Sequence, residues 1–535
     1  MNELPPQADV VFVGAGHNAL VAAAYLLAAG RSVCLLEQMP RPGGWVQTAE
    51  LGAPGFHHDR WSALHPFFVG GPVWAELGPD LRRVGLAYVT APLAMASSLP
   101  DGNAAVIPVD PKAFADELER LGETAGWNAL FAAVGPDLQA LLGLVGVGLD
   151  RPEAETTLAG LLRHHRDGAL PFGQLLAGSA VDLVWRHFRT EELRSLAAPW
   201  PLHIGAGPEA PTSALWAAFA LAALEAGVPT PVGGSGRLTD ALVSLVTERG
   251  GEVLCDIDVD EILVRDGRAT GVRTAAGPIV NANEAVIVST TPDRLYGRLL
   301  RGTPGIPPGV RAQAANYRYR RGCFQLNLAL SARPRFRDAR LDAGGAVNLG
   351  RGVGALVASV RQAEAGLLPA HPSISWHEPT AVDPTRAPEG KAVVRVQVLD
   401  APHTPRGDAA GTRYGTDGWD PPTAEAFADR VLDEAELHVP GLTGLILERH
   451  LTTPADLARA SPNAGPGDHA AGDNSLTQAF TQRPIPAHAG GYRTVVPGAW
   501  LIGAATWPCA GVSGASGRAV ARALIGATKA ARMRG

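Results

Sequence analysis

The stretch from residue 9 to residue 38 restricts the fold more than any other part of this chain of 535 residues. It begins with a β-branched and aromatic run, residues 10–13, which is typical of a strand buried on both faces. A GxGxxA turn (residues 14–19), a helix-forming segment, a second apolar strand and the acidic Glu37 follow in that order. Together they predict a Rossmann-like dinucleotide-binding fold.

The residue types in this turn match the demands of a bound dinucleotide. Gly14 permits a tight turn, Gly16 lets a pyrophosphate approach the backbone, and the small Ala19 lets the helix pack against the strand. A carboxylate at Glu37 would bind the ribose hydroxyls of adenosine and repel a 2′-phosphate, which disfavours NADP. The expected cofactor contacts in this segment are Gly14, Gly16, Asn18, Ala19, Glu37 and Gln38.

A second glycine pair, Gly43-Gly44, favours FAD over NAD. FAD is the longer molecule, and its diphosphate and ribityl chain need another close approach to the backbone. The segment 39–48 resembles the flavin family that joins amine oxidases and phytoene desaturases, in which an arginine usually follows the two glycines. Trp45 stands at that position here and removes a cationic contact, and we expect Gly43, Gly44 and Trp45 to line the cofactor site.

The C-terminal segment 492–527 carries the second strong signal. Residues 499–505 predict a strand that ends at Gly503, and the Gly/Ser-rich run from residue 511 predicts the start of a helix. The N-terminus of a helix presents unpaired N–H groups and a positive dipole end, which would stabilise negative charge on a reduced flavin. The first and last segments therefore build one site, with cofactor contacts expected at Gly503, Ala504, Gly511, Val512 and Ser513.

Both ends of the chain and the segment 229–274 resemble the phytoene-desaturase-like FAD oxidoreductases, and within them the branch named for pyridine nucleotide-disulfide oxidoreductase domain-containing protein 2. The resemblance is thin over 70–225 and 330–470. It implies FAD as cofactor, a backbone contact between Val259 and adenine, and an apolar, polyene-like or secondary-metabolite substrate. Reduced FAD would pass its electrons to oxygen or a quinone.

These observations predict an α/β fold, α+β in part, with a discontinuous Rossmann-like FAD-binding domain and an inserted substrate-binding domain of mixed sheet and helices. The FAD-binding domain is expected at 1–95, 229–300 and 481–535, and the substrate-binding domain at 96–228 and 301–480. Two strongly apolar helices, at 127–149 and 213–227, belong either to the core or to the wall of an apolar substrate tunnel or membrane-touching face.

Composition excludes several other classes of protein. The net charge of −6, without a cluster of lysine and arginine, argues against a nucleic-acid partner. The four cysteines include no CxxC pair and show no metal-site spacing, so no metal is expected. This use of cysteine fits a protein of a reducing compartment. We see no secretory signal and no uninterrupted apolar stretch long enough to span a bilayer, so a cytoplasmic protein is expected. Peripheral membrane contact and the oligomeric state stay open.

The candidates for a direct role in catalysis lie near the glycine motifs. The segment 55–68 concentrates histidines, of which His65 is the first choice for a base and His58 the second. Trp507 precedes the C-terminal helix and is expected to stack on the substrate or the flavin edge. His203 is a weaker candidate in a loop expected to line the substrate site, where a second GxGxxA at 205–210 lacks a clean preceding strand.

The favoured function is an FAD-dependent desaturase or dehydrogenase that accepts hydride from an apolar small molecule. Amine or alcohol oxidation on the same scaffold is an alternative, although the low aromatic content argues mildly against an aromatic cage. Two further alternatives are a redox-neutral flavin isomerase and a non-catalytic FAD-binding partner protein.

Overall fold

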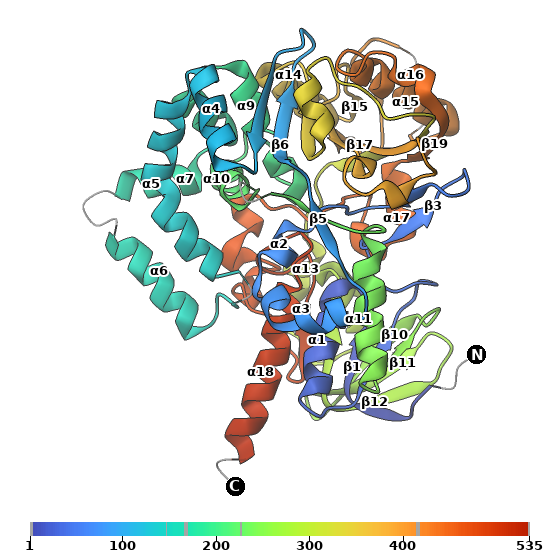
Figure 1. Ribbon diagram of the computed structural model, residues 1–535. Helices are drawn as coiled ribbons and strands as arrows, with labels where there is room; N and C mark the ends of the chain where they lie inside the picture. Colours follow the sequence, from blue (N-terminus) through green and yellow to red (C-terminus); the bar gives the residue numbers. More distant parts are fainter. Residues whose placement is uncertain (1–3, 146, 165–168, 225–226, 413–417, 533–535) are drawn as a thin grey trace.

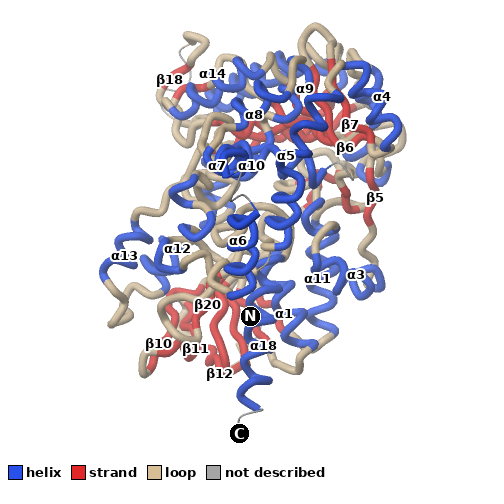
Figure 2. The backbone as a smooth tube through the Cα atoms, turned by 90° about the vertical axis from the view of Figure 1, so that its left-hand side faces the viewer, coloured by secondary structure: helices blue, strands red, loops and turns tan. Residues whose placement is uncertain are grey.

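The computed structural model describes residues 4–532 except 146, 165–168, 225–226 and 413–417. Two large sheets organise the chain, and they occupy opposite ends of the molecule in both views (Figures 1 and 2). The first has the strand order β10-β11-β12-β1-β2-β9, with β20 beside β12. Its strands are β1 (Gln7–Val13), β2 (Val33–Leu36), β9 (Glu252–Leu254), β10 (Val259–Arg265), β11 (Arg268–Thr274), β12 (Ile279–Val288) and β20 (Ala499–Leu501).

The first sheet has a parallel centre because its strands are buried and joined by helices. Strands β1, β2, β9, β12 and β20 pair in parallel, whereas β10 and β11 form an antiparallel extension. Val10, Val11 and Phe12 in β1 are fully buried, as the apolar run predicts. Helices α1 (His17–Ala28), α11 (Gly236–Glu248) and α18 (Ala515–Arg532) cover one face and pack with β1 in one core.

The first sheet joins segments that are far apart in the sequence. Strand β12, from the middle of the chain, lies between β1 near the N-terminus and β20 near the C-terminus. All strands of this sheet fall within the three ranges expected for the FAD-binding domain. The expected domain boundaries remain predictions. The boundary expected at residue 95 falls inside a strand of the second sheet, β6, which begins at Leu93.

The second sheet has the order β19-β13-β17-β16-β14-β6-β7 and is antiparallel except between β14 and β6. One face packs on α15 (Pro421–Glu436) and α16 (Leu442–Leu445), and the other on α5 (Thr124–Gly143), α9 (Glu191–Ala197), α10 (Ser213–Leu224) and α14 (Val353–Glu364). Its strands are β6 (Leu93–Ser98), β7 (Ala104–Pro108), β13 (Gly322–Leu330), β14 (Ala346–Leu349), β16 (Ile374–His377), β17 (Ala392–Ala401) and β19 (Ile446–Thr452).

Further helices and short strand pairs complete the fold. The helices are α2 (Pro66–Val69), α3 (Pro72–Arg83), α4 (Pro111–Leu121), α6 (Pro152–His164), α7 (Ala169–Ala177), α8 (Ala180–His187), α12 (Pro292–Arg294), α13 (Pro308–Ala315) and α17 (Pro454–Ala460). Two-stranded pairs form between β3 (Thr48–Glu50) and β4 (His57–Asp59), between β5 (Tyr88–Thr90) and β8 (Pro229–Pro231), and between β15 (Leu367–Leu368) and β18 (Gly407–Asp408).

Some local expectations shift by a few residues. Strand β20 ends at Leu501 rather than Gly503, and α18 begins at Ala515, so the Gly/Ser-rich run before it is a loop. The second GxGxxA follows a 3₁₀ helix, Trp200–Ile204, and not a strand. Among the described residues, no helix has the length and hydropathy to cross a bilayer, and no three His, Cys, Asp or Glu side chains gather as metal ligands would.

Candidate functional site

The two glycine loops near the N-terminus contact each other through their backbones. The Gly43 amide donates a hydrogen bond to the Ala15 carbonyl oxygen at 2.9 Å, and a Cβ added at Gly44 would lie 3.5 Å from the Gly16 Cα. Gly43 has a φ of +104°, and a Cβ there would overlap Thr239. Only glycine fits both the conformation and the space, so the two loops form one continuous backbone surface.

Glu37 closes this surface at the end of β2. Its Oε2 accepts a hydrogen bond from the Ala15 amide at 2.8 Å, and its Oε1 accepts one from the Met39 amide at 3.0 Å. Burial raises the pKa of this carboxyl, while the backbone donors oppose the shift. The side chain lines a cavity of about 300 Å³, together with Gly14, Gly16, Gln38, Gly44 and Val259.

Arginines surround the same cavity. Arg41, Arg60 and Arg294 line it, and none of the three forms an ion pair with a carboxylate in the described part of the chain. A fourth, Arg298, is paired with Asp258 at 2.6 Å. An anionic diphosphate next to a ribose-binding carboxylate fits this arrangement. Arg41 and Arg294 are not among the residues that the sequence motifs single out, and they supply positive charge to this cavity although Trp45 replaces the family arginine.

A second cavity, of about 270 Å³, adjoins the first at Trp61, which lines both. The rings of Trp45 and Trp61 meet edge to face with their centroids 4.8 Å apart. The expected apolar helices supply a wall of this cavity, because residues of α10 and the end of α5 line it. They are Leu141, Leu215, Trp216, Phe219 and Ala220. Trp45, Ala504, Gly511, Val512 and Ser513 also line this second cavity.

The remaining predicted cofactor contacts lie behind these surfaces. Ser516 Oγ accepts from the Gly503 amide and donates to Asn18 Oδ1, both at 3.0 Å, so α18 is bonded to α1. Gly517 lets the two helices cross closely, because a Cβ at this position would overlap the Asn18 carbonyl group. Four predicted residues, Asn18, Ala19, Gly43 and Gly503, support the cavities without lining either one.

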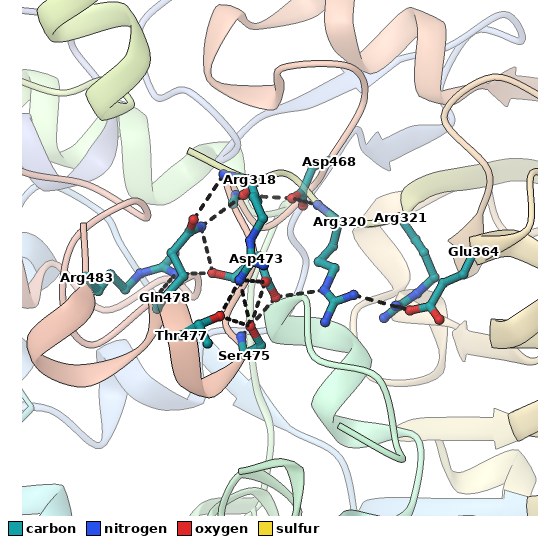
Figure 3. A network of polar contacts seen from close by, with 11 residues as sticks. Arg318, Arg320, Arg321, Glu364, Asp468, Asp473, Ser475, Thr477, Gln478 and Arg483 are labelled. Atoms are coloured by element: carbon teal, nitrogen blue, oxygen red, sulfur yellow. Dashed lines mark hydrogen bonds and ion pairs between the residues drawn. The ribbon is translucent and has the colours of Figure 1, made fainter. Parts of the chain in front are cut away.

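A network of polar side chains around Asp473 includes Arg483 (Figure 3), and Arg483 binds the loop that follows β20. The guanidinium of Arg483 is fully buried and donates to the carbonyl oxygens of Ala504 at 2.7 Å, Asp473 at 2.8 Å and Thr506 at 3.2 Å. The Asp473 carboxylate in turn pairs with Arg320 at 2.8 Å. No sequence motif pointed to Arg483, because its partners are backbone carbonyls from two separate loops.

The structure does not bring His65 or His58 to either cavity. His65 is fully buried, with Nδ1 3.0 Å from the Tyr88 hydroxyl and Nε2 2.7 Å from Ser235 Oγ. Burial lowers the pKa of His65 to about 3 and that of His58 to about 4. The expectation of a base near neutral pH at these positions is corrected, because neither ring lines a cavity and such low pKa values make both rings weak bases. His65 instead joins α2 to Tyr88 and to Ser235 at the start of α11.

Trp507 and His203 do line the second cavity. The Trp507 Nε1 donates to the Leu144 carbonyl oxygen at 3.0 Å, and its ring centroid lies 5.7 Å from that of Phe480. His203 stacks on Trp200 at 5.0 Å, and burial lowers its pKa to about 3. Trp200, His203 and Ile204 of the 3₁₀ helix before the second GxGxxA thus line the cavity, whereas no residue of 205–210 does.

Comparison with known proteins identifies the relatives of this chain. It is 27% identical to a rat protein named pyridine nucleotide-disulfide oxidoreductase domain-containing protein 2, over 98% of this chain and 94% of that protein. It is 26% identical to a lycopene-forming phytoene desaturase of Pseudescherichia vulneris, over 96% and 98%. Its fold matches cyclohexylamine oxidase from Brevibacterium oxydans with a TM-score of 0.57 and 17% identity, over 98% and 100%.

A family model described as flavin containing amine oxidoreductase matches residues 20–404. That range covers more than half of the chain, and the glycine loops, the carboxylate and the unpaired arginines of the first cavity fit the flavin dinucleotide it implies. The cofactor is FAD, and the chain belongs to the flavin-containing amine oxidoreductase family.

Proposed function

We propose that this oxidoreductase removes hydride from a C–H bond of an apolar small molecule and thereby desaturates it. The observation that carries the proposal is the lining of the second cavity, which is mostly aromatic and aliphatic. Among its described lining residues, none is aspartate or glutamate and one, Arg395, is lysine or arginine. Such walls favour an apolar molecule and exclude water from it.

The residues of the chain bind and orient the reactants. Bound FAD supplies the two-electron acceptor. Gly511, Val512 and Ser513 bring backbone groups to the cavity just before α18, where partial positive charge favours an electron-rich ring. Trp507 and Phe219 provide flat apolar surfaces that limit how a substrate lies. Burial lowers the pKa of His203 and of His377 to about 3, which makes both rings weak bases, so we assign neither of them the role of a base in the reaction.

Amine oxidation is the second candidate, since the family name and the matched cyclohexylamine oxidase point to it. The cavity gives it less support. A protonated amine would enter a site that offers no carboxylate among the described lining residues and holds the cationic Arg395. The phytoene desaturase relative is named for a hydrocarbon, which agrees better with the lining.

The electron acceptor and the surroundings of the enzyme belong to the same proposal. We propose oxygen or a quinone as the acceptor, as the chemistry of reduced flavin allows. An apolar substrate would reside in lipid, so we also propose peripheral contact with a membrane.

The test is to mix the FAD-loaded protein anaerobically with a polyene hydrocarbon, an amine and an alcohol in separate experiments. The measured quantity is the absorbance of the flavin in its blue band, which falls when the flavin is reduced. Bleaching by the polyene supports desaturation, whereas bleaching by the amine alone replaces it with amine oxidation. A protein that binds FAD but is bleached by none of them favours the isomerase or the non-catalytic alternative. A protein that takes up no FAD contradicts the cofactor assignment.

A further inference from the structure

The floor of the second cavity is polar, unlike its walls. It is formed by the second sheet, where Arg395 and Gln397 of β17 line the cavity together with Gln325 of β13 and His377 of β16. Strand register places His377 directly beside Arg395, and Gln325 directly beside Gln397. The Gln397 amide donates to Gln325 Oε1 at 2.9 Å. Gln325 also donates to the Arg60 carbonyl oxygen at 2.9 Å and to Asn327 Oδ1 at 2.7 Å, so its polar groups are bound within the protein, and Arg395 and His377 remain side by side on neighbouring strands.

Arg395 is a buried cation without a carboxylate of its own. It is 9% exposed, and no described carboxylate lies within ion-pairing distance of its guanidinium. The buried acid that acts electrostatically on Arg395 is Asp59, which is paired with Arg386 at 3.0 Å and also accepts from the Ser235 amide at 2.7 Å. One carboxylate therefore acts electrostatically on two guanidiniums and pairs directly with Arg386, so Arg395 at the cavity floor has no ion-pair partner among the described residues.

The hydrogen-bonding capacity of Arg395 is also only partly used. One nitrogen, Nη1, donates to the Trp61 carbonyl oxygen, whereas Nε is buried with no partner. His377 beside it is 4% exposed, is neutral because burial lowers its pKa to about 3, and has no partner at Nδ1. Buried donors and charges without partners cost free energy, so a group that pairs with them inside the cavity binds with a large gain.

We propose that the substrate of this enzyme is amphipathic: an apolar body that ends in a carboxylate, which Arg395 binds at the cavity floor. A carboxylate supplies the missing negative charge and accepts from the guanidinium. The apolar body then lies along Leu215, Trp216 and Phe219 of α10. This inference rests on the proposed oxidation of an apolar molecule and narrows its substrate class.

The test is isothermal titration of the FAD-loaded protein with dodecanoate, methyl dodecanoate, dodecanol and dodecylamine, which share one chain and differ in the head group. We expect dodecanoate to bind at least about tenfold more tightly than the other three compounds. If the wild-type protein binds dodecanoate and methyl dodecanoate with equal affinity, the inference is overturned and no variant is needed.

Variants at Arg395 assign the preference to this side chain. Arg395→Gln should remove the advantage of dodecanoate, by about tenfold or more, and leave dodecanol binding unchanged. Arg395→Lys keeps the charge and should keep most of the preference. The control is Arg361→Gln, which removes a guanidinium that is 69% exposed and does not line the cavity. A preference for dodecanoate that survives in Arg395→Gln overturns the inference.

The outcomes separate this inference from the proposed function, because binding is measured without turnover. A dodecanoate preference that depends on Arg395 supports the inference even if no compound bleaches the flavin. Bleaching by an uncharged polyene, with no dodecanoate preference, supports the proposed function and overturns the inference. If Arg395→Gln changes the flavin spectrum or FAD affinity but not head-group selectivity, Arg395 serves the cofactor and the inference is overturned.

Discussion

Arg483 donates a hydrogen bond from Nη2 to the carbonyl oxygen of Ala504 at 2.7 Å, and through it a fully buried charge supports the loop that faces the second cavity. Its other partners are carbonyl oxygens of the loops at Asp473 and Thr506. The cavity wall thus depends on a side chain that does not line it.

Arg483→Met should therefore lower both stability and FAD retention. It leaves several buried carbonyl oxygens unpaired, at a cost of about 3 kcal/mol or more. Thermal unfolding and the ratio of flavin to protein absorbance measure the two effects. Arg318→Met is the matched control, since Arg318 belongs to the same network but its side chain is 55% exposed. Equal loss in both variants would contradict the role of Arg483.

The two glycines of the second loop should respond differently to alanine. Gly43 has a φ of +104°, and an alanine Cβ there would overlap the Thr239 side chain. Gly44 has a φ of +58°, and an alanine Cβ there would lie 3.5 Å from the Gly16 Cα, which is an ordinary contact distance. We expect Gly43→Ala to weaken FAD binding more than Gly44→Ala in equilibrium dialysis. Gly30→Ala, at a φ of +81° with open space around it, should cost only about 1 kcal/mol of stability and keep FAD affinity. The reverse order for Gly43 and Gly44 would show that the contact with Thr239 relaxes easily.

Stability should fall as the pH drops from about 6.5 towards 3. Burial lowers the pKa of His65 to about 3, so the unfolded chain binds a proton in this range that the folded chain does not. Each such histidine contributes a slope of up to about 1.4 kcal/mol per pH unit. His65→Gln should flatten this slope in denaturant titrations at several pH values. It should leave the pH profile of turnover unchanged, and a profile that loses one ionisation would restore His65 as a base.

Trp507→Ala should impair turnover without affecting the first cavity. It removes a flat surface of the second cavity and the hydrogen bond to the Leu144 carbonyl oxygen, so we expect kcat/KM for a substrate that bleaches the flavin to fall by about tenfold or more. Trp185→Ala is the control, because Trp185 is 54% exposed. Unchanged kinetics in Trp507→Ala would indicate that the ring is only part of the core, or that the chain does not act as an enzyme.

Part of the lining of the first cavity could be predicted from the sequence, because several of the groups that form it lie close together in one segment of the chain. The backbone of Gly14, Gly16 and Gly44 and the carboxylate of Glu37 act within one segment, and their spacing follows from the strand, turn and helix that carry them. The contribution of the C-terminal segment was predictable for the same reason. A glycine-rich run between a strand and a helix is typical of a segment that lets a ligand approach the backbone closely.

The polar contacts of the site could not be predicted in this way. His65 lies in a motif-rich segment, yet its two nitrogens are bound to Tyr88 and Ser235, which the fold brings from distant positions. Whether a histidine is a base or a structural residue depends on such partners and on burial.

The sequence by itself determined the dinucleotide-binding fold, the preference for FAD and the apolar character of α5 and α10, because these follow from residue type and spacing along one segment. Only the tertiary structure decided that Arg41, Arg60 and Arg294 converge on one cavity, that Arg483 supports the loop of Ala504, and that Arg395 lies in the second cavity without an ion-pair partner among the described residues. Each of these depends on which side chains become neighbours across sheets and loops, and the burial of a charge is a property of its surroundings and not of its position in the chain.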